Sequence, residues 1–258
     1  MTPSIIPLGQ TTMALCRLGP DDASVALVWA HGWGQSGAAF MELARAFQTR
    51  AQSMVLDLPG FGASGLPPEG WGTENYADAI ADWLATLPPG RRVWIGHSFG
   101  CRVGLQVAAR HPTLLDGMVL VAAAGLPPHR GIARKVALRS RIYAYKVARM
   151  FVPEGPARDH LRARFGSVDA RNAGPLRKVL VRAVNENLSN VAARVRCPTV
   201  LIYGDGDQDT PPEIGERLHR LISGSQLRIL NGYDHHTILT NGRYQVAGEI
   251  QRLLKGLG

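Results

Sequence analysis

Short, mostly apolar runs alternate with amphipathic stretches along this chain, and no other feature limits its possible folds as strongly. Runs such as SVALVWA and PTVLIY are typical of strands buried on both faces, and the stretches between them have helical spacing. The strand-like runs lie at 24–30, 53–58, 92–96, 117–122, 198–203 and 226–230, and the helical stretches at 38–51, 75–87, 99–110, 212–222 and 244–254. This order predicts an α/β fold with a mostly parallel sheet covered by helices, to which residues 11–18 add an edge strand.

The alternation stops between residues 126 and 196. This stretch has helical periodicity at 132–151 and 176–191 and contains no strand-like run. We therefore divide the chain into a first core part at 1–125, a helical insertion at 126–196 and a second core part at 197–258. Ligands of open α/β sheets bind at the carboxyl ends of the strands, so an insertion that leaves this edge is expected to cover the site as a cap.

The positive charge of the chain is concentrated in the same stretch. The formal net charge is +9, from 29 Lys and Arg against 20 Asp and Glu. Residues 126–196 hold 16 of the basic and 4 of the acidic residues. Such a basic face attracts acidic partners, although a general preference for arginine over lysine would also contribute. No nucleic-acid partner is expected, because the arginines do not alternate with aromatic residues as a base-stacking platform requires.

Cysteine usage and hydropathy indicate the compartment. Cys16, Cys101 and Cys197 are odd in number, widely separated and not at metal-ligand spacing. They argue against a disulfide framework and a metal site, and they fit a reducing compartment, so we expect a cytoplasmic protein. No window approaches the roughly 18 apolar residues of a membrane span. The first 20 residues do not resemble a secretory signal.

The pentapeptide GHSFG at 96–100 matches the pattern G-x-S-x-G. It follows an apolar strand and opens a helix, which is the context that exposes a serine oxygen on a sharp strand-to-helix turn. We therefore predict Ser98 as a nucleophile. A serine hydroxyl is a poor nucleophile until a base removes its proton, and that base needs a carboxylate to orient it.

The acid and the base are expected to follow the serine in that order. GDGDQDTP at 204–211 comes directly after a strand, and we choose Asp207 over Asp205 and Asp209 as the acid. GYDHH at 232–236 follows the last strand, and we choose His235 over His236 as the base. The sequence therefore predicts a Ser98–His235–Asp207 triad.

Such a site also needs donors for a developing oxyanion. One is expected from the backbone N–H of Phe99, the residue after the nucleophile. The other is expected from the backbone N–H of Trp33, in the HGWG loop that follows the first predicted central strand. We expect His31 to hold this loop in shape. Trp33 and Phe99 are also our candidates for substrate binding, although the Trp33 ring reads equally well as a core aromatic.

These motifs resemble the α/β-hydrolase superfamily over nearly the whole chain. The supporting segments are HGWG at 31–34, DLPGFGASG at 57–65, GHSFG at 96–100, GDGDQDTP at 204–211 and GYDHH at 232–236. The resemblance implies a twisted sheet of eight strands with an inserted helical cap, and it favours Asp207 and His235. Asp234 departs from the family pattern, in which glycine usually precedes the histidine. The resemblance also implies that Asp57 is structural, and we expect Cys101 to be a packing residue.

A serine at this position implies an acyl-enzyme and transfer of the acyl group to water. Dehalogenases and epoxide hydrolases of this superfamily need Asp as the nucleophile, so Ser98 argues against both. We predict a serine hydrolase that needs no cofactor and cleaves a small carboxylic ester or lactone. Thioesters, amides and C–C bonds between carbonyl groups stay open, and so does a non-catalytic ligand-binding role, which some members of the superfamily have.

HGWG, DLPGFG and a basic cap also resemble, more weakly, the methyl ester esterases that act on pimeloyl-acyl-carrier protein. In that group, arginines of the cap hold the acidic carrier. The resemblance implies an alternative substrate, a methyl ester or thioester bound to an acyl-carrier protein. The residues placed to form such a face are Arg134, Lys135, Arg139, Arg141, Lys146, Arg149, Arg158 and Arg162.

Overall fold

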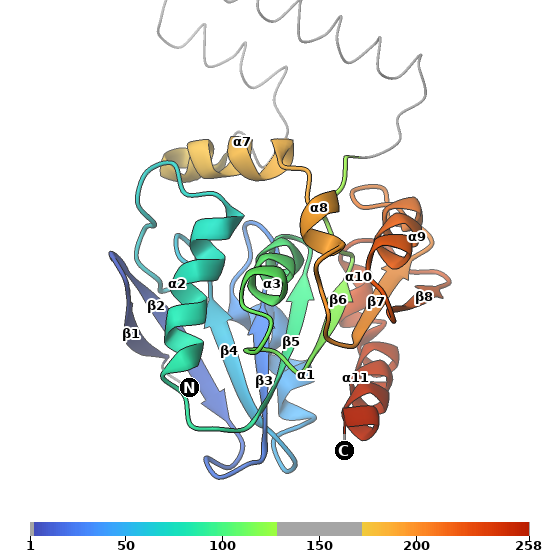
Figure 1. The fold of residues 1–258 in the computed structure, drawn as a ribbon, viewed down its shortest axis with the longest axis horizontal. Coiled ribbons are helices and arrows are strands. Elements are labelled where there is room, and N and C mark those ends of the chain that lie inside the picture. Colours follow the sequence, from blue (N-terminus) through green and yellow to red (C-terminus); the bar gives the residue numbers. More distant parts are fainter. Residues whose placement is uncertain (1–2, 128–171, 258) are drawn as a thin grey trace, which may run out of the picture.

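The computed structural model describes residues 3–127 and 172–257. The strands in these ranges form one eight-stranded sheet (Figure 1). In spatial order the strands are β1 (Ser4–Leu8), β2 (Thr11–Leu18), β4 (Gln52–Asp57), β3 (Val25–Ala30), β5 (Arg91–His97), β6 (Gly117–Val121), β7 (Thr199–Gly204) and β8 (Gln226–Leu230). β2 pairs antiparallel with β1 and with β4. The pairs from β4 through β3 to β8 are parallel. The prediction of a mostly parallel, eight-stranded α/β sheet is confirmed.

Helices cover both faces of the sheet and enclose two hydrophobic cores (Figure 1). One face carries α2 (Thr73–Ala85), α3 (Phe99–Arg110), α8 (Ser189–Ala192) and α9 (Pro212–Leu221). The other carries η1 (Gly37–Phe40), α1 (Met41–Arg45), α10 (Thr237–Thr240) and α11 (Arg243–Leu257). Above the edge of the first face lie η2 (Gly174–Leu176) and α7 (Arg177–Asn185).

The central strands are apolar on both sides because each side faces a helical layer. In β5, Trp94 joins the core under α2 and α3, while its neighbours Val93 and Ile95 join the opposite core. Successive side chains of a strand point to opposite faces, so a strand between two layers reads as a continuous apolar run. In the second core, the ring of Trp29 packs against Phe40, with ring centroids 5.4 Å apart.

Two predicted elements differ from the structure. Residues 11–18 form strand β2 as predicted, but the prediction that they are the edge strand is wrong, because β1 pairs outside them through a tight hairpin at Gly9, where φ is 58°. The single helix predicted over 38–51 is instead η1 followed by the short α1. The apolar residues of that stretch do pack as expected, since Phe40, Leu43 and Phe47 are buried.

The described end of the predicted insertion packs on the first core. Leu176, Val179 and Ala183 are buried in the same cluster as residues of α2 and α3. The helix predicted at 132–151 and the eight basic residues of the predicted carrier-binding face lie outside the described residues. The division into 1–125, 126–196 and 197–258 therefore stays a prediction. Within the described ranges, no helix is both long enough and apolar enough to cross a bilayer.

Parallel strands bring distant residues to one edge of the sheet. His31 follows the end of β3, Ser98 follows β5, Ala122 follows β6, Asp207 follows β7 and His235 follows β8. The carboxyl ends of neighbouring parallel strands meet at the same edge, so these five residues come together although they are far apart in the sequence.

The first turn of α3 lies so close to β3 that only glycine fits at position 100. A Cβ atom on Gly100 would lie 2.0 Å from the carbonyl oxygen of Ala30. We expect Gly100→Ala to lower the free energy of unfolding by about 3 kcal/mol, because the backbone would have to move. Gly248→Ala, at a position in α11 where a Cβ meets nothing within 4 Å, is the control and should raise stability by about 0.5–1 kcal/mol. Urea denaturation of both variants measures the difference, and equal midpoints would contradict the prediction.

Candidate active site

Ser98 occupies a strained turn between β5 and α3. Its φ of 47° and ψ of −102° lie outside the regions that L-residues usually adopt. Such a conformation costs about 1–3 kcal/mol and persists only when its surroundings hold it. Here the N–H of Ser98 donates to the carbonyl of Val121 at 3.1 Å, and the Ser98 carbonyl accepts from the N–H of Cys101 at 3.2 Å. The G-x-S-x-G segment therefore has the local geometry that the sequence predicted.

Small residues next to the turn make this geometry possible. A Cβ on Gly96 would lie 2.9 Å from the backbone nitrogen of Cys101. Cys101 itself is buried, and its thiol donates to the carbonyl of Val121 at 3.4 Å. Burial raises the pKa of the Cys101 thiol well above its usual range. Cys101 is thus a protonated packing residue, as expected.

Asp207 and His235 form a buried hydrogen-bonded pair. His235 Nδ1 lies 2.8 Å from Asp207 Oδ2, and the two residues are 8% and 1% exposed. A carboxylate can only accept, so Nδ1 carries the proton and Nε2 is left with its lone pair. Burial acts to raise the pKa of Asp207, but the hydrogen bonds from His235 and Thr210 hold it below its usual value. The carboxylate is therefore ionised and the imidazole has the tautomer of a base.

The alternative acids, Asp205 and Asp209, and the alternative base, His236, are more exposed than the buried pair. Asp205 and Asp209 are exposed, and Asp205 Oδ1 accepts the N–H of Gly232 at 2.8 Å. His236 is exposed as well. The structure joins the side chains of Asp207 and His235 by a hydrogen bond. Asp209 contacts Asp207 only through its backbone N–H in the described residues, and the ring of His236 meets that of His235 edge-on, with centroids 5.2 Å apart. Among the described residues, no hydrogen bond joins the Ser98 hydroxyl to His235, which is common in sites without substrate.

Asp234 has a structural role that explains its departure from the family pattern. Its Oδ1 accepts the backbone N–H groups of His236 and Thr237, at 2.9 and 2.8 Å. These bonds lower the pKa of Asp234 to about 2. The carboxylate thus closes the turn that presents His235 and begins α10.

The HGWG loop is fixed to the turn at Ser98. The N–H of Gly100 donates to the carbonyl of His31 at 3.0 Å. In the described part of the chain, the backbone N–H groups of Trp33 and Phe99 donate to no other residue. The two donors predicted for an oxyanion are therefore both unpaired, on segments that this bond holds side by side.

His31 holds two loops in place, as expected. Its Nε2 accepts the N–H of Leu58 at 3.0 Å, and its Nδ1–H donates to the carbonyl of Gly32 at 2.7 Å. Burial lowers the pKa of His31 to about 4, so the ring is neutral near pH 7. Asp57 is structural in the same way, because its carboxylate accepts the N–H groups of Gly37 and Ala63 at 2.7 and 2.8 Å.

Sequence reasoning gave no role to His97, which the structure places at the centre of the site. Its Nε2–H donates to the carbonyl of His235 at 2.9 Å, and its Nδ1 lies 3.2 Å from the side-chain oxygen of Gln35. Burial, together with the nearby His235, lowers the pKa of His97 to about 3. This neutral ring is hydrogen-bonded to the backbone of the base, and its Nδ1 side packs closely against Gly32 of the HGWG loop. The variable position of G-x-S-x-G carries no sequence signal for such a link.

Aromatic rings cluster around Phe99, the residue after Ser98. The ring of Trp33 is half-buried and meets Phe61 and Phe99 edge-on, with centroids 5.0 and 5.4 Å away. Tyr76 meets Phe99 edge-on at 5.4 Å. The Trp33 ring therefore packs against the core through this cluster, and its role in substrate binding stays a prediction.

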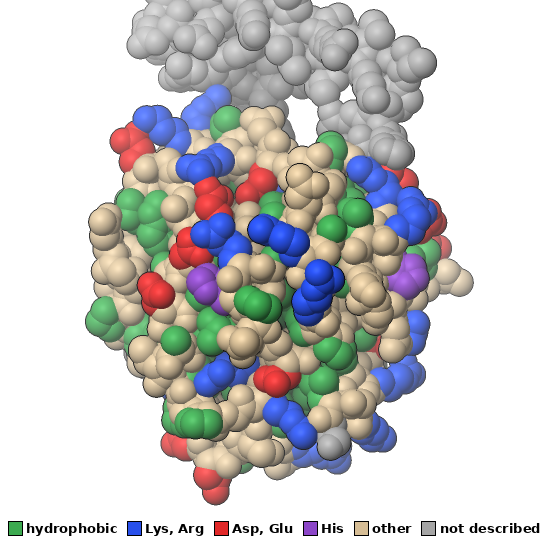
Figure 2. Space-filling model, in the orientation of Figure 1, with side chains coloured by type: hydrophobic (Ala, Val, Ile, Leu, Met, Phe, Trp, Pro, Cys, Tyr) green, Lys and Arg blue, Asp and Glu red, His purple; other side chains and the backbone are tan. Residues whose placement is uncertain are grey.

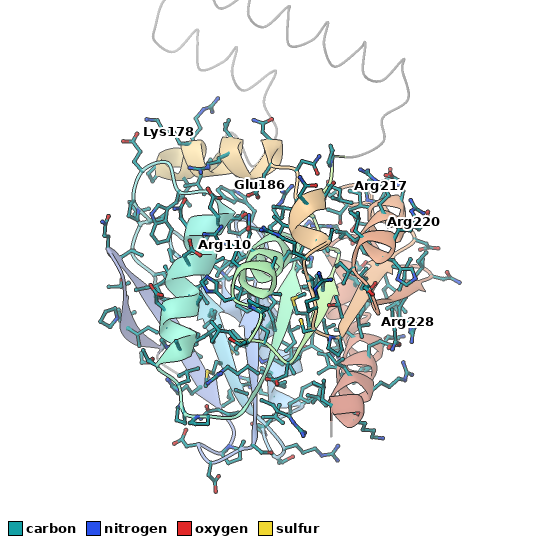
Figure 3. The ribbon with its side chains drawn as sticks, viewed as in Figure 1. Arg110, Lys178, Glu186, Arg217, Arg220 and Arg228 are labelled. Atoms are coloured by element: carbon teal, nitrogen blue, oxygen red, sulfur yellow. The ribbon has the colours of Figure 1, made fainter. Side chains whose placement is uncertain are left out.

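A separate groove lies on the outer face between α3, α7 and α8. It has a volume of about 870 Å³, and none of the predicted site residues lines it. Basic and acidic side chains are interspersed on this face (Figure 2). Arg110 pairs with Asp78 at 2.6 Å, Lys178 pairs with Glu69, and Glu186 accepts from Gln106 (Figure 3). These pairs fasten α7 and α3 to their neighbours, so the groove is built from structural contacts.

Comparison with known proteins agrees with this architecture. The model of a family described as alpha/beta hydrolase fold matches residues 25–146. A pimeloyl-[acyl-carrier protein] methyl ester esterase of Chromobacterium violaceum is 31% identical over 217 residues, which cover 78% of this chain and 81% of that protein. The chain belongs to the α/β-hydrolase family. This α/β hydrolase is also similar to an esterase of the same description from Neisseria meningitidis, with 27% identity over 87% of the chain and 75% of the relative.

Solved structures share the fold of this α/β hydrolase. An esterase from Exiguobacterium antarcticum matches with a TM-score of 0.75 and 20% identity, covering 97% of this chain and 99% of that one. The enol-lactonase from Burkholderia xenovorans matches with a TM-score of 0.74 and 17% identity, covering 98% and 100%.

The buried Asp207–His235 pair predicts that turnover needs the carboxylate of Asp207 and not that of Asp205. We expect Asp207→Asn to lower the rate of p-nitrophenyl acetate hydrolysis about a thousandfold or more, because an amide stabilises neither the base tautomer nor the imidazolium. Asp205→Asn keeps an oxygen that accepts from Gly232, so its rate should stay within about threefold of the wild type. Stopped-flow release of p-nitrophenol measures both rates. The opposite order of effects would reassign the acid to Asp205.

Proposed function

We propose that this α/β hydrolase is a serine carboxylesterase whose catalytic residues are Ser98, His235 and Asp207. The observation that carries the proposal is the buried hydrogen bond of 2.8 Å between Asp207 and His235, at the same sheet edge as the strained Ser98. A strained serine turn alone would fit a tight loop, and a buried Asp–His pair alone would fit a structural ion pair. Their convergence at the carboxyl ends of β5, β7 and β8 favours nucleophilic catalysis.

The proposed reaction uses these groups in two half-reactions. Ser98 Oγ attacks the carbonyl carbon of the ester while its proton moves to His235 Nε2. The oxyanion that forms accepts from the N–H groups of Trp33 and Phe99. The C–O bond then breaks, and His235 returns the proton to the leaving alcohol. Water attacks the acyl-enzyme, gives a proton to His235 and releases the acid, and the proton returns to Ser98.

The surroundings favour an acyl group that is apolar next to the carbonyl carbon. Trp33 and Phe99, which carry the proposed oxyanion donors, pack their rings against each other and against Phe61. An ester or a lactone with an apolar acyl group fits against these rings, and neither requires a cofactor for this mechanism. The three free thiols are consistent with the proposed cytoplasmic location.

The first test compares the wild type with Ser98→Ala on p-nitrophenyl esters from acetate to dodecanoate. We expect turnover by the wild type and a loss of about a thousandfold or more in the variant, because the attacking oxygen is removed. The chain-length optimum gives the size of the acyl pocket. Equal rates in the two proteins would refute the proposal. No turnover in either protein, with tight binding of an ester analogue, would favour a non-catalytic binding role.

A second candidate substrate is a methyl ester or thioester carried by an acyl-carrier protein. It is favoured by the names of the relatives from Chromobacterium violaceum and Neisseria meningitidis and by the 16 basic residues in the stretch 126–196. The proposed partner is an acidic carrier, which the basic stretch would hold beside Ser98. The chemistry at the site would be the same as for a small ester.

Charge reversal separates the two substrates. Arg139→Glu combined with Arg141→Glu, at positions outside the described residues, should raise KM for a carrier-bound methyl ester about tenfold at low salt. Turnover of p-nitrophenyl acetate should not change. Arg50→Glu reverses one exposed charge just before the amino end of β4, at the opposite sheet edge, and is the control, with half the charge change of the double variant. An unchanged KM in the double variant would argue against the carrier.

A further inference from the structure

The hydroxyl of Thr210 contacts both members of the Asp207–His235 pair. Thr210 follows Asp207 by three residues and is 6% exposed. Its Oγ1 lies 2.9 Å from Asp207 Oδ2 and 3.2 Å from His235 Nδ1. A third neighbour, the carbonyl oxygen of Ala122, lies 3.0 Å away. The hydroxyl is therefore part of the pair's own hydrogen-bond network.

The Thr210 hydroxyl can donate to only one of its neighbours at a time. A hydroxyl has a single proton, so Thr210 can donate either to Asp207 or to Ala122. Hydrogen bonds to an ionised acceptor are about twice as strong as those between neutral groups. Because Asp207 is ionised, it receives the proton, and a lone pair of Oγ1 faces the Nδ1–H of His235. The carboxylate of Asp207 then accepts four hydrogen bonds.

The four donors divide evenly between the two carboxylate oxygens. Oδ1 accepts the backbone N–H groups of Asp209 and Thr210, at 2.9 and 2.8 Å. Oδ2 accepts the Thr210 hydroxyl and the imidazole of His235. Four bonds fill the accepting capacity of a carboxylate. The Thr210 hydroxyl thus occupies the site on Oδ2 that the imidazole leaves open.

The backbone after β6 offers the alternative acceptor for this proton. Ala122 has a φ of 49°, an uncommon value for a residue other than glycine. Its N–H donates to the carbonyl of Ile202 at 2.8 Å, so the turn is tied to β7. The Ala122 carbonyl lies 3.0 Å from Thr210 Oγ1 and competes with Asp207 for the single hydroxyl proton. It is the ionised state of Asp207 that turns the hydroxyl toward the pair.

We infer that Thr210 is a positioning residue, whose hydroxyl fixes Asp207 Oδ2 toward His235 and limits how strongly the carboxylate holds the imidazole proton. The inference rests on the proposed function. Without the hydroxyl, Asp207 loses one donor and its pKa rises. A more basic carboxylate stabilises the imidazolium form of His235. The imidazole then becomes free to act as a base only at a higher pH.

The test is the pH profile of kcat/KM for p-nitrophenyl acetate in Thr210→Val, which removes the hydroxyl and keeps the shape. We expect the acidic limb to move up by about half a pH unit and kcat to fall about fivefold, the effect of one lost hydrogen bond. Thr210→Ser keeps the hydroxyl and should retain the wild-type profile. Thr199→Val is the control, because the hydroxyl of this buried threonine donates to the carbonyl of Cys197, at 3.0 Å, at the opposite end of β7 from Asp207.

A second readout does not depend on turnover. Proton NMR of the Nδ1–H of His235 in the Ser98→Ala background should show the same upward move of its titration midpoint in Thr210→Val. Thr210→Ala is a second variant without the hydroxyl, should the valine fail to fold. A wild-type midpoint in these variants, or a serine variant that behaves like valine, would overturn the inference. Absence of turnover in the wild type would count against the proposed function alone.

Discussion

The close contact between the first turn of α3 and the end of β3 is the constraint on which the site depends. Because position 100 is glycine, the helix approaches the carbonyl oxygen of Ala30 to a distance that no side chain would allow. The same approach lets the N–H of Gly100 donate to His31. One contact therefore fixes the strained serine, the start of its helix and the loop that carries the second unpaired N–H group. A shift of this helix would separate all three.

The electrostatics of the site follow from burial. Asp207 is an ionised carboxylate with almost no exposure, and it stays ionised because backbone and side-chain donors surround it. Two buried histidines, His31 in the HGWG loop and His97 beside the base, are neutral because burial lowers their pKa values to about 4 and 3. A charged imidazole at His97 would repel the imidazolium that the proposed reaction forms at His235. The neutral His97 ring removes this repulsion.

The sequence predicted the fold well because the sheet is covered on both faces. Continuous apolar runs such as that of β5 give strong signals for strands, and the helix 99–110 was predicted with its observed bounds. The edge was predicted poorly, because β1 is short, mostly exposed and contains Pro7, which is atypical of a strand interior. The single helix predicted over 38–51 is shorter in the structure, where α1 covers only Met41–Arg45. Phe40 and Phe47 are buried with helical spacing, and this spacing does not require a continuous helix.

Within the site, residues in motifs could be predicted and the residues that orient them could not. Ser98, Asp207 and His235 stand at fixed places relative to glycines and strand ends, so a pattern can point to them. His97 meets a residue 138 positions away, and Thr210, although it lies three residues after Asp207, also contacts His235, 25 positions away. No local pattern encodes such a contact. Only the register of β5 to β8 determines which side chains surround the pair.

In the proposed function, chemistry and carrier recognition belong to different parts of this chain. The proposed reaction depends on strand ends held by backbone hydrogen bonds, where a change of one charge alters the protonation of the pair. The basic excess lies in the stretch 126–196, which contains none of the three proposed catalytic residues. Between exposed charges, attraction weakens over about 10 Å at ordinary ionic strength. A change in that stretch can therefore alter which acidic partner is captured without altering Asp207 and His235. The structural neighbours include an esterase and an enol-lactonase, so the fold alone does not determine the substrate.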